Sequence, residues 1–458
     1  MSQVNQVKLG AKFIADTPHR VSHDRCLWAA RMRRDKVASE IPEWEEMRSL
    51  ASQIKLHTLT HLDRYLEEFE TRLKENGVHV HWAEDAEEHN RIVHEIFTAH
   101  HVKTVTKGKS MLMDECGMRE YLEARGIDVY EADLGERIQQ LDNQRPSHIV
   151  MPAIHKLRGD VAKLFAEKLG SDPDIDDPHY LNSVMRKNMR QNYIKVDAGM
   201  NGVNFAVAET GTIVVATNEG NADISANVPP LFVASVGIEK LIPRQRDLPL
   251  FIRLLSRSAL GFDITQYTSH YTRPRKGQEM HVIIVDNGRS KRLGADYFEV
   301  LKCIRCGACM NTCPVFRRTS GISYDAPYMG PIGIVLEPSY DLHSYARLPY
   351  SCTHCGSCGN VCPVKVPIPE YVFYWRTEVV ERHEDELMHR MEESGMALAL
   401  RNSTNLSHAE KLGLWALRNL PKWLLNSPAN PWAKDHANPD PPKETFREYY
   451  FRSIKDKG

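Results

Sequence analysis

The first 75 residues have the apolar spacing of amphipathic helices. Leucine, isoleucine and phenylalanine recur at intervals of three, four or eight residues, which places them on one side of a helix. Asn76 and Gly77 then supply a helix stop. The positions of this predicted stripe are Leu50, Ile54, Leu62, Leu66, Phe69 and Leu73. We therefore predict a helical N-terminal region over residues 1–76.

From Val78 onward, short β-branched runs alternate with helical stretches. The predicted strands cover 78–82, 102–106, 128–131 and 148–152. The predicted helices cover 86–99, 118–125 and 156–168. This alternation is typical of a doubly wound α/β fold, in which helices cover both faces of a mainly parallel sheet.

The middle of the chain breaks this alternation with a predicted hairpin. Residues 205–217 have the pattern of two strands joined at Thr210 and Gly211, and the polar loop 218–223 follows them. The remaining predicted elements are a strand over 230–236, a helix over 247–260 and a closing strand over 280–285. Because open α/β sheets bind ligands at strand ends, the polar loops of this α/β domain, residues 77–294, are candidate ligand sites.

The C-terminal end of the chain is also predicted to be helical. One helix is expected to run for roughly two dozen residues from Glu370. A capping box from Ser407 to Glu410 predicts the start of another helix, which Pro421 interrupts. Its apolar residues are Leu412, Trp415, Leu417 and Leu420, followed by Trp423 and Leu424. We expect this region, 386–458, to pack on the chain itself, with docking to a partner subunit or a membrane interface as the alternative.

The overall composition sets limits on function. The chain has 458 residues, enough for two or three domains, and a formal net charge of -1. This balance gives no basis for general binding to nucleic acid, and the basic, aromatic-laced patch that such binding needs is also missing from the sequence. The N-terminus lacks the apolar core of a secretory signal, and no apolar run approaches membrane-spanning length. We expect a cytoplasmic protein, with peripheral contact at the inner face of the membrane as the alternative.

Eight of the ten cysteines lie in two copies of the motif C-x-x-C-x-x-C-x-x-x-C-P. This is the bacterial pattern for [4Fe-4S] clusters, in which closely spaced thiolates hold the corners of a cubane. Gly307, Gly356 and Gly359 would let the backbone approach the sulfides closely. A disulfide framework is typical of short secreted chains, and a zinc site usually has two separated C-x-x-C pairs, so both alternatives fit less well. We predict an iron-sulfur domain over residues 295–385.

In two-cluster ferredoxins, the fourth cysteine of each motif ligates the other cluster. This rule assigns one [4Fe-4S] cluster to Cys303, Cys306, Cys309 and Cys362. It assigns the second to Cys352, Cys355, Cys358 and Cys313. Two clusters held by such shared motifs lie close together and exchange one electron at a time, so we predict a role in electron transfer.

Basic side chains gather in and around the first Cys motif. They are Lys302, Arg305, Arg317 and Arg318. Positive charge near a cluster favours its reduced state and raises its potential, and it also offers a docking face to an acidic partner. Solvated surface cations without such a role are an equally good interpretation.

Several stretches together resemble a known family. They are Pro152-Ala-Ile-His155, Ala208-Glu-Thr-Gly-Thr, Thr217-Asn-Glu-Gly-Asn, Arg257-Ser-Ala, Val285-Asp-Asn-Gly-Arg-Ser290 and the first Cys motif. The chain resembles the lactate utilisation protein B family over nearly its whole length. The resemblance implies a LUD (lactate utilisation) domain, related in fold to sugar-phosphate isomerases and CoA-transferases. It also implies an α-helical ferredoxin domain like that of succinate dehydrogenase iron-sulfur subunits.

The family implies a role in oxidising L-lactate to pyruvate within a complex of three proteins. The implied partners are a Cys-rich CCG-domain subunit and a smaller LUD-domain subunit. This chain is then expected to be an oxidoreductase component that passes electrons singly through its clusters, rather than a complete enzyme.

Four residues of the α/β domain are candidates for binding and deprotonating a hydroxy acid. Lys109 is a candidate cation for the carboxylate, and Glu209 or Glu219 is a candidate base for the hydroxyl proton. His155 is a further candidate base. The glutamates also have an interpretation as capping or structural residues at strand ends, and His155 as a capping or packed imidazole. The LUD domain is then a docking scaffold.

A second function stays open on the sequence alone. In this interpretation the α/β domain is itself an enzyme that binds a nucleotide, a CoA ester or a sugar phosphate, and the clusters are regulatory or structural. The chain contains neither G-x-G-x-x-G nor G-x-x-x-x-G-K-[ST], which weakens the case for Rossmann-type dinucleotide binding and for a P-loop.

Overall fold

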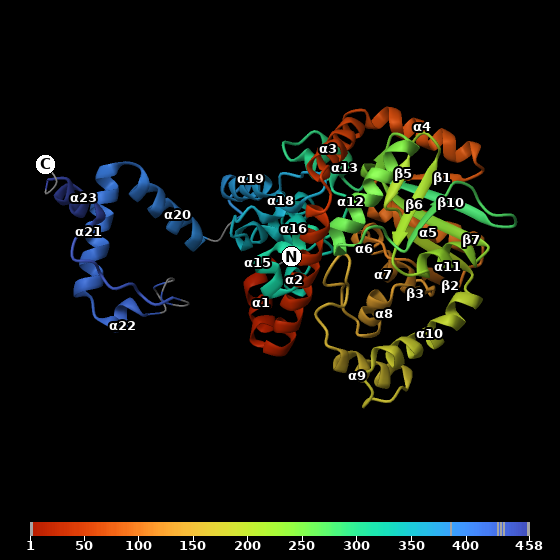
Figure 1. The fold of residues 1–458 in the computed structure, drawn as a ribbon, viewed down its shortest axis with the longest axis horizontal. Coiled ribbons are helices and arrows are strands. Elements are labelled where there is room, and N and C mark those ends of the chain that lie inside the picture. The colour runs from red at the N-terminus through yellow and green to blue at the C-terminus, as the bar shows by residue number, and fades with distance from the viewer. Residues whose placement is uncertain (1–2, 385–386, 428–429, 431–432, 434–435, 456–458) are drawn as a thin grey trace. The chain divides into compact units, whose positions relative to one another are not determined.

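The chain folds into two compact units. The computed structural model describes residues 3–384, 387–427, 430, 433 and 436–455. The first unit, residues 1–381, contains the sheet and both Cys motifs, and the second, residues 382–458, contains the C-terminal helices (Figure 1).

The N-terminal region is helical, as predicted. Its helices are α1 (Gln6–Ala15), α2 (Thr17–Ser39), α3 (Trp44–Thr60) and α4 (Leu62–Glu75). Phe69 and Leu73 of the predicted stripe are buried on α4, but Leu50 on α3 is 50% exposed. The buried side of α3 carries Lys55 instead, whose ammonium group donates to backbone oxygens of the α/β domain. An apolar pattern cannot detect a buried lysine, and this explains the wrong prediction for Leu50.

Within the described residues, six parallel strands form the main sheet in the order β1-β10-β7-β4-β2-β3 (Figure 1). They are β1 (His79–Ala83), β2 (Thr104–Lys107), β3 (Asp128–Glu131), β4 (Ala198–Gly202), β7 (Leu231–Gly237) and β10 (Glu279–Val285). Every residue of the central strand β7 is buried. Such strands have nearly continuous apolar sequences because both faces of a parallel sheet are covered.

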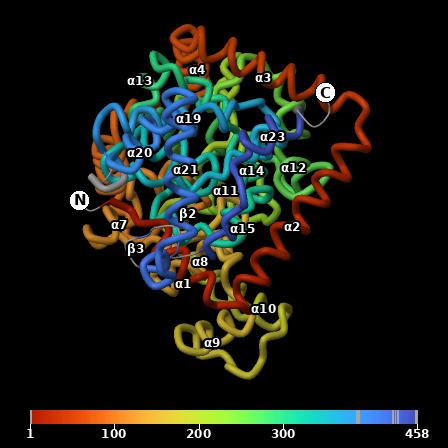
Figure 2. The backbone as a smooth tube through the Cα atoms, turned by 90° about the vertical axis from the view of Figure 1, so that its left-hand side faces the viewer, coloured from red at the N-terminus to blue at the C-terminus, as the bar shows by residue number. Residues whose placement is uncertain are grey.

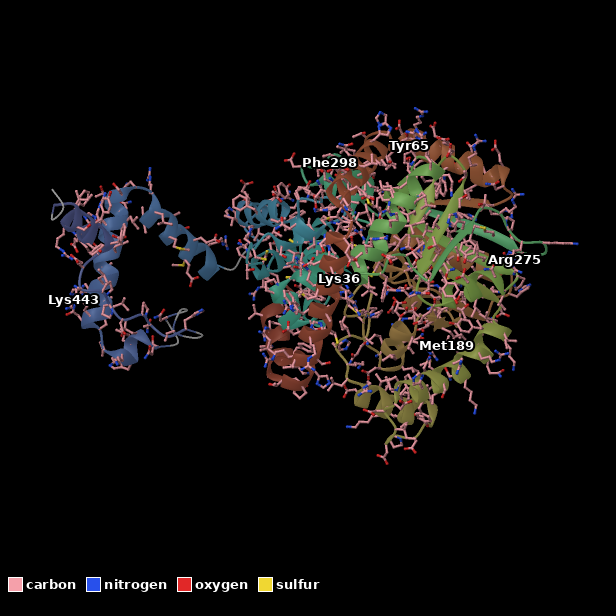
Figure 3. All side chains as sticks on the ribbon, viewed as in Figure 1. Lys36, Tyr65, Met189, Arg275, Phe298 and Lys443 are labelled. Atoms are coloured by element: carbon pink, nitrogen blue, oxygen red, sulfur yellow. The ribbon has the colours of Figure 1, made fainter. Side chains whose placement is uncertain are left out.

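Helices and a second sheet cover the two faces of the main sheet. The helices on one face are α5 (Ala86–Ala99), α6 (Met111–Glu115) and α7 (Met118–Glu123). On the other face, Tyr65 and Phe69 of α4 belong to the same buried cluster as side chains of β7 and β10. Tyr65 is labelled on α4 in Figure 3. The predicted arrangement of helices around a parallel sheet is therefore confirmed.

A helical projection extends from the sheet. It contains α8 (Leu134–Leu141), α9 (Arg158–Leu169) and α10 (Pro178–Lys195), and it lies at the lower end of Figures 1 and 2. Its apolar core contains Phe165 and Met189, of which Met189 is labelled in Figure 3. The strand predicted over 148–152 is wrong. Nδ1 of His148 accepts the backbone N–H groups of Val150 and Met151 at 2.9 and 3.1 Å, which holds this segment in a turn.

The hairpin predicted over 205–217 is present, and it is part of a four-stranded sheet in the order β8-β5-β6-β9. The elements of this part are β5 (Phe205–Val207), β6 (Thr212–Thr217), α11 (Asn221–Asn227), η1 (Ile238–Lys240), β8 (Leu241–Ile242), η2 (Gln245–Asp247), α12 (Leu248–Leu260) and β9 (Tyr267–Tyr271). Gly211 in the hairpin turn has φ 65°, a left-handed conformation that favours glycine.

The iron-sulfur region is built from short helices. They are α13 (Arg289–Leu293), η3 (Phe298–Lys302), α14 (Ala308–Thr312), α15 (Pro314–Thr319), η4 (Gly321–Tyr324), α16 (Gly330–Leu336), η5 (Glu337–Ser339), α17 (Leu342–Tyr345), η6 (Leu348–Ser351), α18 (Ser357–Val361) and α19 (Ile368–Glu381). The N-terminal helix α2 runs along this region and contacts α12, α14 and α15 (Figure 2). The first and last parts of this unit therefore share one core.

The second unit contains α20 (Leu387–Leu400), α21 (Ser403–Asn419), α22 (Lys422–Leu425) and α23 (Phe446–Lys455). The capping box predicted at Ser407 is wrong, because α21 begins four residues earlier and the side chain of Asn402 accepts the N–H of Asn405 at 2.8 Å. The long helix predicted from Glu370 is also wrong, since α19 ends at Glu381. Among the described residues, no helix combines the length and apolarity needed to cross a membrane.

Candidate functional site

The two Cys motifs have the same local backbone. Arg305 and His354 occupy matching positions and have φ values of 59° and 52°. Gly307 and Gly356 also match, with φ values of 77° and 74°, and each precedes the short helix that carries the third cysteine. Left-handed residues turn the chain sharply, so each motif folds back on itself over its first three cysteines.

Backbone N–H groups donate to the sulfur atoms in both motifs. The N–H of Arg305 donates to Sγ of Cys303 at 3.4 Å, and the N–H of His354 donates to Sγ of Cys352 at 3.3 Å. The fourth cysteine of the second motif, Cys362, accepts from a backbone N–H at 3.3 Å. Such hydrogen bonds stabilise thiolates and influence the potential of a cluster that they hold.

The fourth cysteine of each motif lies near cysteines of the other motif. Burial raises the pKa of the Cys306 thiol, and the charge of Cys362 raises it further. Burial likewise raises the pKa of Cys313 to about 11, with further contributions from Cys352 and Cys355. The helices α14 and α18 are in contact. Free thiols with N–H donors, grouped across the two motifs in this way, fit a pair of [4Fe-4S] clusters.

A cavity of about 260 Å³ opens at the carboxyl ends of β2, β4 and β7. This is the edge at which open α/β sheets bind ligands. Its lining includes Lys109, Asn201, Glu219, Lys240, Arg305 and Tyr328. The first four belong to the α/β domain, whereas Arg305 lies inside the first Cys motif. The cavity therefore connects the predicted ligand site with the iron-sulfur region.

Lys109 and Glu219 occupy the α/β side of this cavity. Nζ of Lys109 donates to the backbone oxygen of Val150 at 2.9 Å. Burial raises the pKa of Glu219, and the nearby charge of Asp133 raises it further, while Lys109 acts in the opposite direction. A carboxyl group with a raised pKa next to a cation is a suitable proton acceptor for a bound hydroxy acid.

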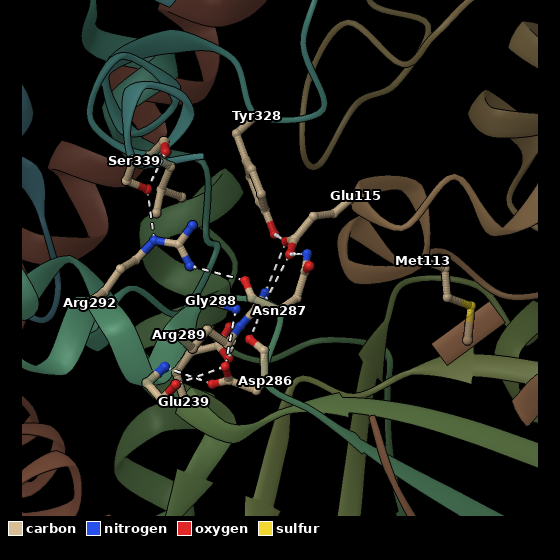
Figure 4. A network of polar contacts seen from close by, with 12 residues as sticks. Met113, Glu115, Glu239, Asp286, Asn287, Gly288, Arg289, Arg292, Tyr328 and Ser339 are labelled. Atoms are coloured by element: carbon tan, nitrogen blue, oxygen red, sulfur yellow. Dashed lines mark hydrogen bonds and ion pairs between the residues drawn. The ribbon is translucent and has the colours of Figure 1, made fainter. Parts of the chain in front are cut away.

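A buried ion network joins the α/β domain to the iron-sulfur region (Figure 4). Arg289 donates to both carboxylate oxygens of Glu115 at 2.9 Å and to Oε2 of Glu239 at 2.6 Å. The hydroxyl of Tyr328 donates to Glu115 at 2.5 Å. Although burial opposes ionisation, Arg289 and nearby cations hold the pKa of Glu239 down to about 2. This network fixes the wall of the cavity on which Arg305 lies.

Arg305 is held by this network and still has an unused donor. Its side chain is 7% exposed, its Nη2 lies 3.8 Å from Oε1 of Glu239, and its guanidinium lies 4.7 Å from the ring centre of Tyr328. Within the part of the chain that the structure describes, Nη1 of Arg305 has no hydrogen-bond partner. A buried, unpaired guanidinium N–H is costly, so an anion in the cavity would satisfy it.

Comparison with known proteins identifies the two domains and the family. Residues 66–293 match the model of the LUD domain, and residues 299–366 match that of a 4Fe-4S dicluster domain. The lactate utilization protein B of Oceanobacillus iheyensis is 37% identical over 432 residues, which are 91% of this chain and 90% of that protein. This chain belongs to the lactate utilization protein B family. The resemblance noted in the sequence is thereby confirmed.

A second relative agrees with this family assignment. The lactate utilization protein B of Macrococcus caseolyticus is 38% identical over 442 residues, covering 93% of this chain and 92% of that protein. Among solved structures, a DUF162 family protein from Deinococcus radiodurans matches with a TM-score of 0.28 and 12% identity, over 49% of this chain and 98% of that one. Family membership and the domain matches confirm the predicted fold class of an α/β LUD domain followed by an iron-sulfur domain.

The other two candidate residues of the α/β domain lie outside this cavity. Glu209 follows β5, at the opposite end of the hairpin from Glu219, and accepts the N–H of Gln245 at 2.8 Å. His155 lines a separate cavity and bonds Ser147 through Nδ1 at 2.6 Å. Burial lowers the pKa of His155 to about 3. The structure therefore brings together Lys109 and Glu219, but not all four candidates.

Sequence reasoning missed the arginines of the N-terminal helices. Nε of Arg48 donates to the backbone oxygen of Cys362 at 2.9 Å, and Nη2 of Arg34 donates to that of Val361 at 3.3 Å. Both arginines thus hold the end of the second Cys motif in place. For Arg34, the sequence offered only a run of arginines at 31, 33 and 34, and nothing in this run indicated a partner more than 300 residues away. Arg48 lies outside this run.

Proposed function

We propose that this chain is the iron-sulfur electron-transfer subunit of a complex that oxidises L-lactate to pyruvate. The observation that carries the proposal is the cavity with Lys109 and Glu219 on one side and Arg305 of the first Cys motif on the other. The names of the relatives support lactate as the substrate. The dicluster domain match supports an iron-sulfur role.

The chemistry requires a path for two electrons. Oxidation of lactate breaks one O–H and one C–H bond. The O–H proton goes to a base, and the C–H hydrogen leaves with two electrons as hydride to an organic redox cofactor of the complex, from which the clusters take the electrons singly. A bound [4Fe-4S] cluster supplies one-electron transfer, so a pair of clusters can divide the two electrons. We assign one cluster to Cys303, Cys306, Cys309 and Cys362, because the motif of the first three also contributes Arg305 to the cavity. We assign the other to Cys352, Cys355, Cys358 and Cys313.

The protein groups of the cavity then bind and deprotonate the substrate. Lys109 and the free Nη1 of Arg305 provide cationic donors for the lactate carboxylate. Glu219 accepts the hydroxyl proton, because its raised pKa is closer to the pH at which the reaction runs. The buried network around Arg289 keeps Arg305 in position. This scheme assigns no role to Glu209 or His155, and a catalytic role for either residue stays a prediction.

The proposed complex also contains a CCG-domain Cys-rich subunit and a smaller LUD-domain subunit. The lactate-binding step is assigned to this chain, and the later electron acceptors belong to the partners. Co-purification followed by mixing with L-lactate, with and without the partners, shows whether this chain reduces its clusters alone. Bleaching only in the complete complex would place the hydrogen-removing step on a partner.

The decisive experiment compares two glutamates. Glu219→Gln removes the base inside the cavity, whereas Glu209→Gln makes the same change at the other end of the hairpin. In the reconstituted complex we expect lactate-dependent cluster bleaching to fall by about 100-fold or more in Glu219→Gln and to be unchanged in Glu209→Gln. Dithionite must bleach both variants as it bleaches the unsubstituted protein. Equal lactate-dependent rates in both variants would contradict the assignment of Glu219.

A further inference from the structure

A cluster of histidines lies at the amino-terminal ends of β1 and β10, at the opposite end of these parallel strands from the cavity. His79 and His81 alternate along β1, and Glu279 and His281 alternate along β10. His79 is directly paired with His281 in the sheet register. Because alternate residues of a strand point to the same face, these four side chains share one face of the sheet.

Three imidazole nitrogens surround one carboxylate oxygen in this cluster. The distances to Oε1 of Glu279 are 2.9 Å from Nε2 of His281, 3.4 Å from Nε2 of His100 and 3.6 Å from Nε2 of His79. His100 follows the last residue of α5, the helix that packs on this face. The cluster thus gathers residues from β1 and the end of α5, which are neighbours in the sequence, and from β10, which comes much later in the chain.

We propose that His79, His100, His281 and Glu279 form a binding site for one divalent transition-metal ion of the zinc type. Zinc takes four N, O or S ligands at about 2.0–2.2 Å in a tetrahedron, which sets neighbouring ligand atoms about 3.3 Å apart. Ligand atoms of His79, Glu279 and His281 all lie within 4.8 Å of one another, so side-chain movements can bring them to this spacing. His100, with Nε2 3.4 Å from Oε1 of Glu279, would supply the fourth ligand after a larger movement. Imidazole nitrogen with a single carboxylate is a donor set that suits zinc better than calcium or magnesium.

The surroundings of His281 also have the form of a metal site. Nδ1 of His281 lies 2.9 Å from Nε2 of His81, so the ring is oriented by a second histidine while its Nε2 faces Glu279. Metal-binding histidines commonly have such a partner on the other ring nitrogen. His281 is buried and the side chain of His79 is 58% exposed, so a cation can enter from the solvent side.

The proposed ion would connect parts of the LUD domain that no disulfide joins. β1 is an edge strand of the main sheet, and His79 would tie its start to β10 and to the end of α5. An ion that binds the folded state and not the unfolded chain stabilises the fold in proportion to its occupancy. We therefore assign the site a stabilising role that is independent of lactate oxidation.

Cobalt binding tests the site directly, because Co²⁺ substitutes for Zn²⁺ and its spectrum reports the ligands. The probe is CoCl₂ added anaerobically to protein whose iron and sulfide content has first been measured, with cluster absorbance subtracted. We expect one additional Co²⁺ per chain, with d–d bands and no thiolate charge-transfer band. ZnCl₂ should compete with it and raise the melting temperature.

Three variants separate this site from other metal-binding groups. The double variant His79→Gln and His281→Gln should lose the Co²⁺ bands and the melting shift. His81→Gln should keep the stoichiometry and weaken the affinity by about 10–100-fold. His94→Gln is the control, because His94 lies on α5, the helix that ends just before His100, but its ring contacts Tyr121 instead.

Two outcomes would overturn the proposal. One is equal Co²⁺ binding by the double variant and the His94→Gln control. The other is that the unsubstituted protein binds no additional Co²⁺, or binds it only with a thiolate charge-transfer band. If substitution of the buried His281 prevents folding, His79→Gln alone decides the question, because this exposed side chain can be replaced without opening the core. Unchanged Co²⁺ affinity in that single variant would equally reject the site.

Discussion

Glu337 is a carboxyl group enclosed within the iron-sulfur region. Its Oε1 accepts the backbone N–H of Tyr328 at 2.6 Å. Burial raises the pKa of Glu337 to about 8, and the charge of Glu115 adds to the rise. The folded protein therefore keeps a proton that the unfolded chain releases once the pH exceeds the ordinary glutamate value. The contribution of Glu337 to the free energy of unfolding is thus full at low pH and is lost as the pH rises from about 4.5 to about 8.

Substituting Glu337→Gln should remove this pH dependence. Glutamine keeps the oxygen that accepts from Tyr328 and has no proton to lose. We expect the variant to be more stable than the unsubstituted protein at pH 7, by as much as about 3 kcal/mol, and similar to it at pH 4.5. Urea unfolding of the cluster-loaded protein under anaerobic conditions at both pH values measures this difference. Parallel pH profiles would show that Glu337 does not titrate in this range.

The charge balance of the buried network around Arg289 should contribute to the free energy of unfolding. Arg289→Met would leave the carboxylates of Glu115 and Glu239 buried without their main cation. Removing one partner of a buried ion pair usually costs about 3–5 kcal/mol, and we expect a loss of that size. The control is Arg253→Met, which breaks an exposed pair with Glu43 and should cost less than about 1 kcal/mol. Similar free energies of unfolding for the two variants would contradict this account.

At the scale of elements, the hairpin turn packs against helix α4 through a glycine. A Cβ atom at Gly211 would lie 2.8 Å from the backbone of Arg72, and the residue has φ 65°. Gly77 has φ 79° but no atom within 4 Å of the same added Cβ. Gly77→Ala should therefore cost only the left-handed conformation, about 1–2 kcal/mol. Gly211→Ala should cost about 1–3 kcal/mol more, because α4 must also move.

Thermal unfolding of the two alanine variants, measured side by side, tests this packing. Both variants carry the same left-handed backbone strain, so the difference between their melting temperatures reports the contact with α4. A melting temperature for Gly211→Ala equal to that of Gly77→Ala would mean that the hairpin and α4 are not tightly packed.

Elements with a strong local pattern could be predicted from the sequence. The strand over 128–131 and the helix over 86–99 have the predicted bounds, and the hairpin around Gly211 is correct. These elements are specified by residues within a few positions of one another. The order of the strands could not be predicted, because β10 enters the sheet between β1 and β7 through contacts made across most of the domain.

The failures have identifiable physical causes. The apolar run at 148–152 forms a turn because the side chain of His148 bonds its own backbone, and propensity does not register such a bond. Ser407 matched a capping box, but Asn402 caps the helix earlier. In the site, the cavity joins Lys109 to Arg305, residues almost 200 positions apart. The sequence offered Lys109 as a ligand candidate and Arg305 as a cation of the Cys motif, without showing that they line the same cavity.

At the scale of the whole molecule, the N-terminal helices and the iron-sulfur region depend on each other. Leu27 and Ala30 of α2 are fully buried, and α2 contacts both α14 and α15. Arg48 of α3 donates to the backbone of Cys362. The helical start of the chain therefore encloses the Cys motifs and shares one buried cluster with them.

Two truncations test this dependence. Residues 1–381 form a compact unit that contains all eight motif cysteines, so this shorter chain should keep the iron and acid-labile sulfide content of the full protein. A chain of residues 40–458 lacks α1 and α2, which uncovers the buried face of α14 and removes the hydrogen bond from Arg34 to Val361. We expect that chain to lose most of its iron on anaerobic desalting, because water and chelators then reach the thiolates. Full iron content in residues 40–458, or its loss in residues 1–381, would show that the cluster-binding core has been assigned to the wrong part of the chain.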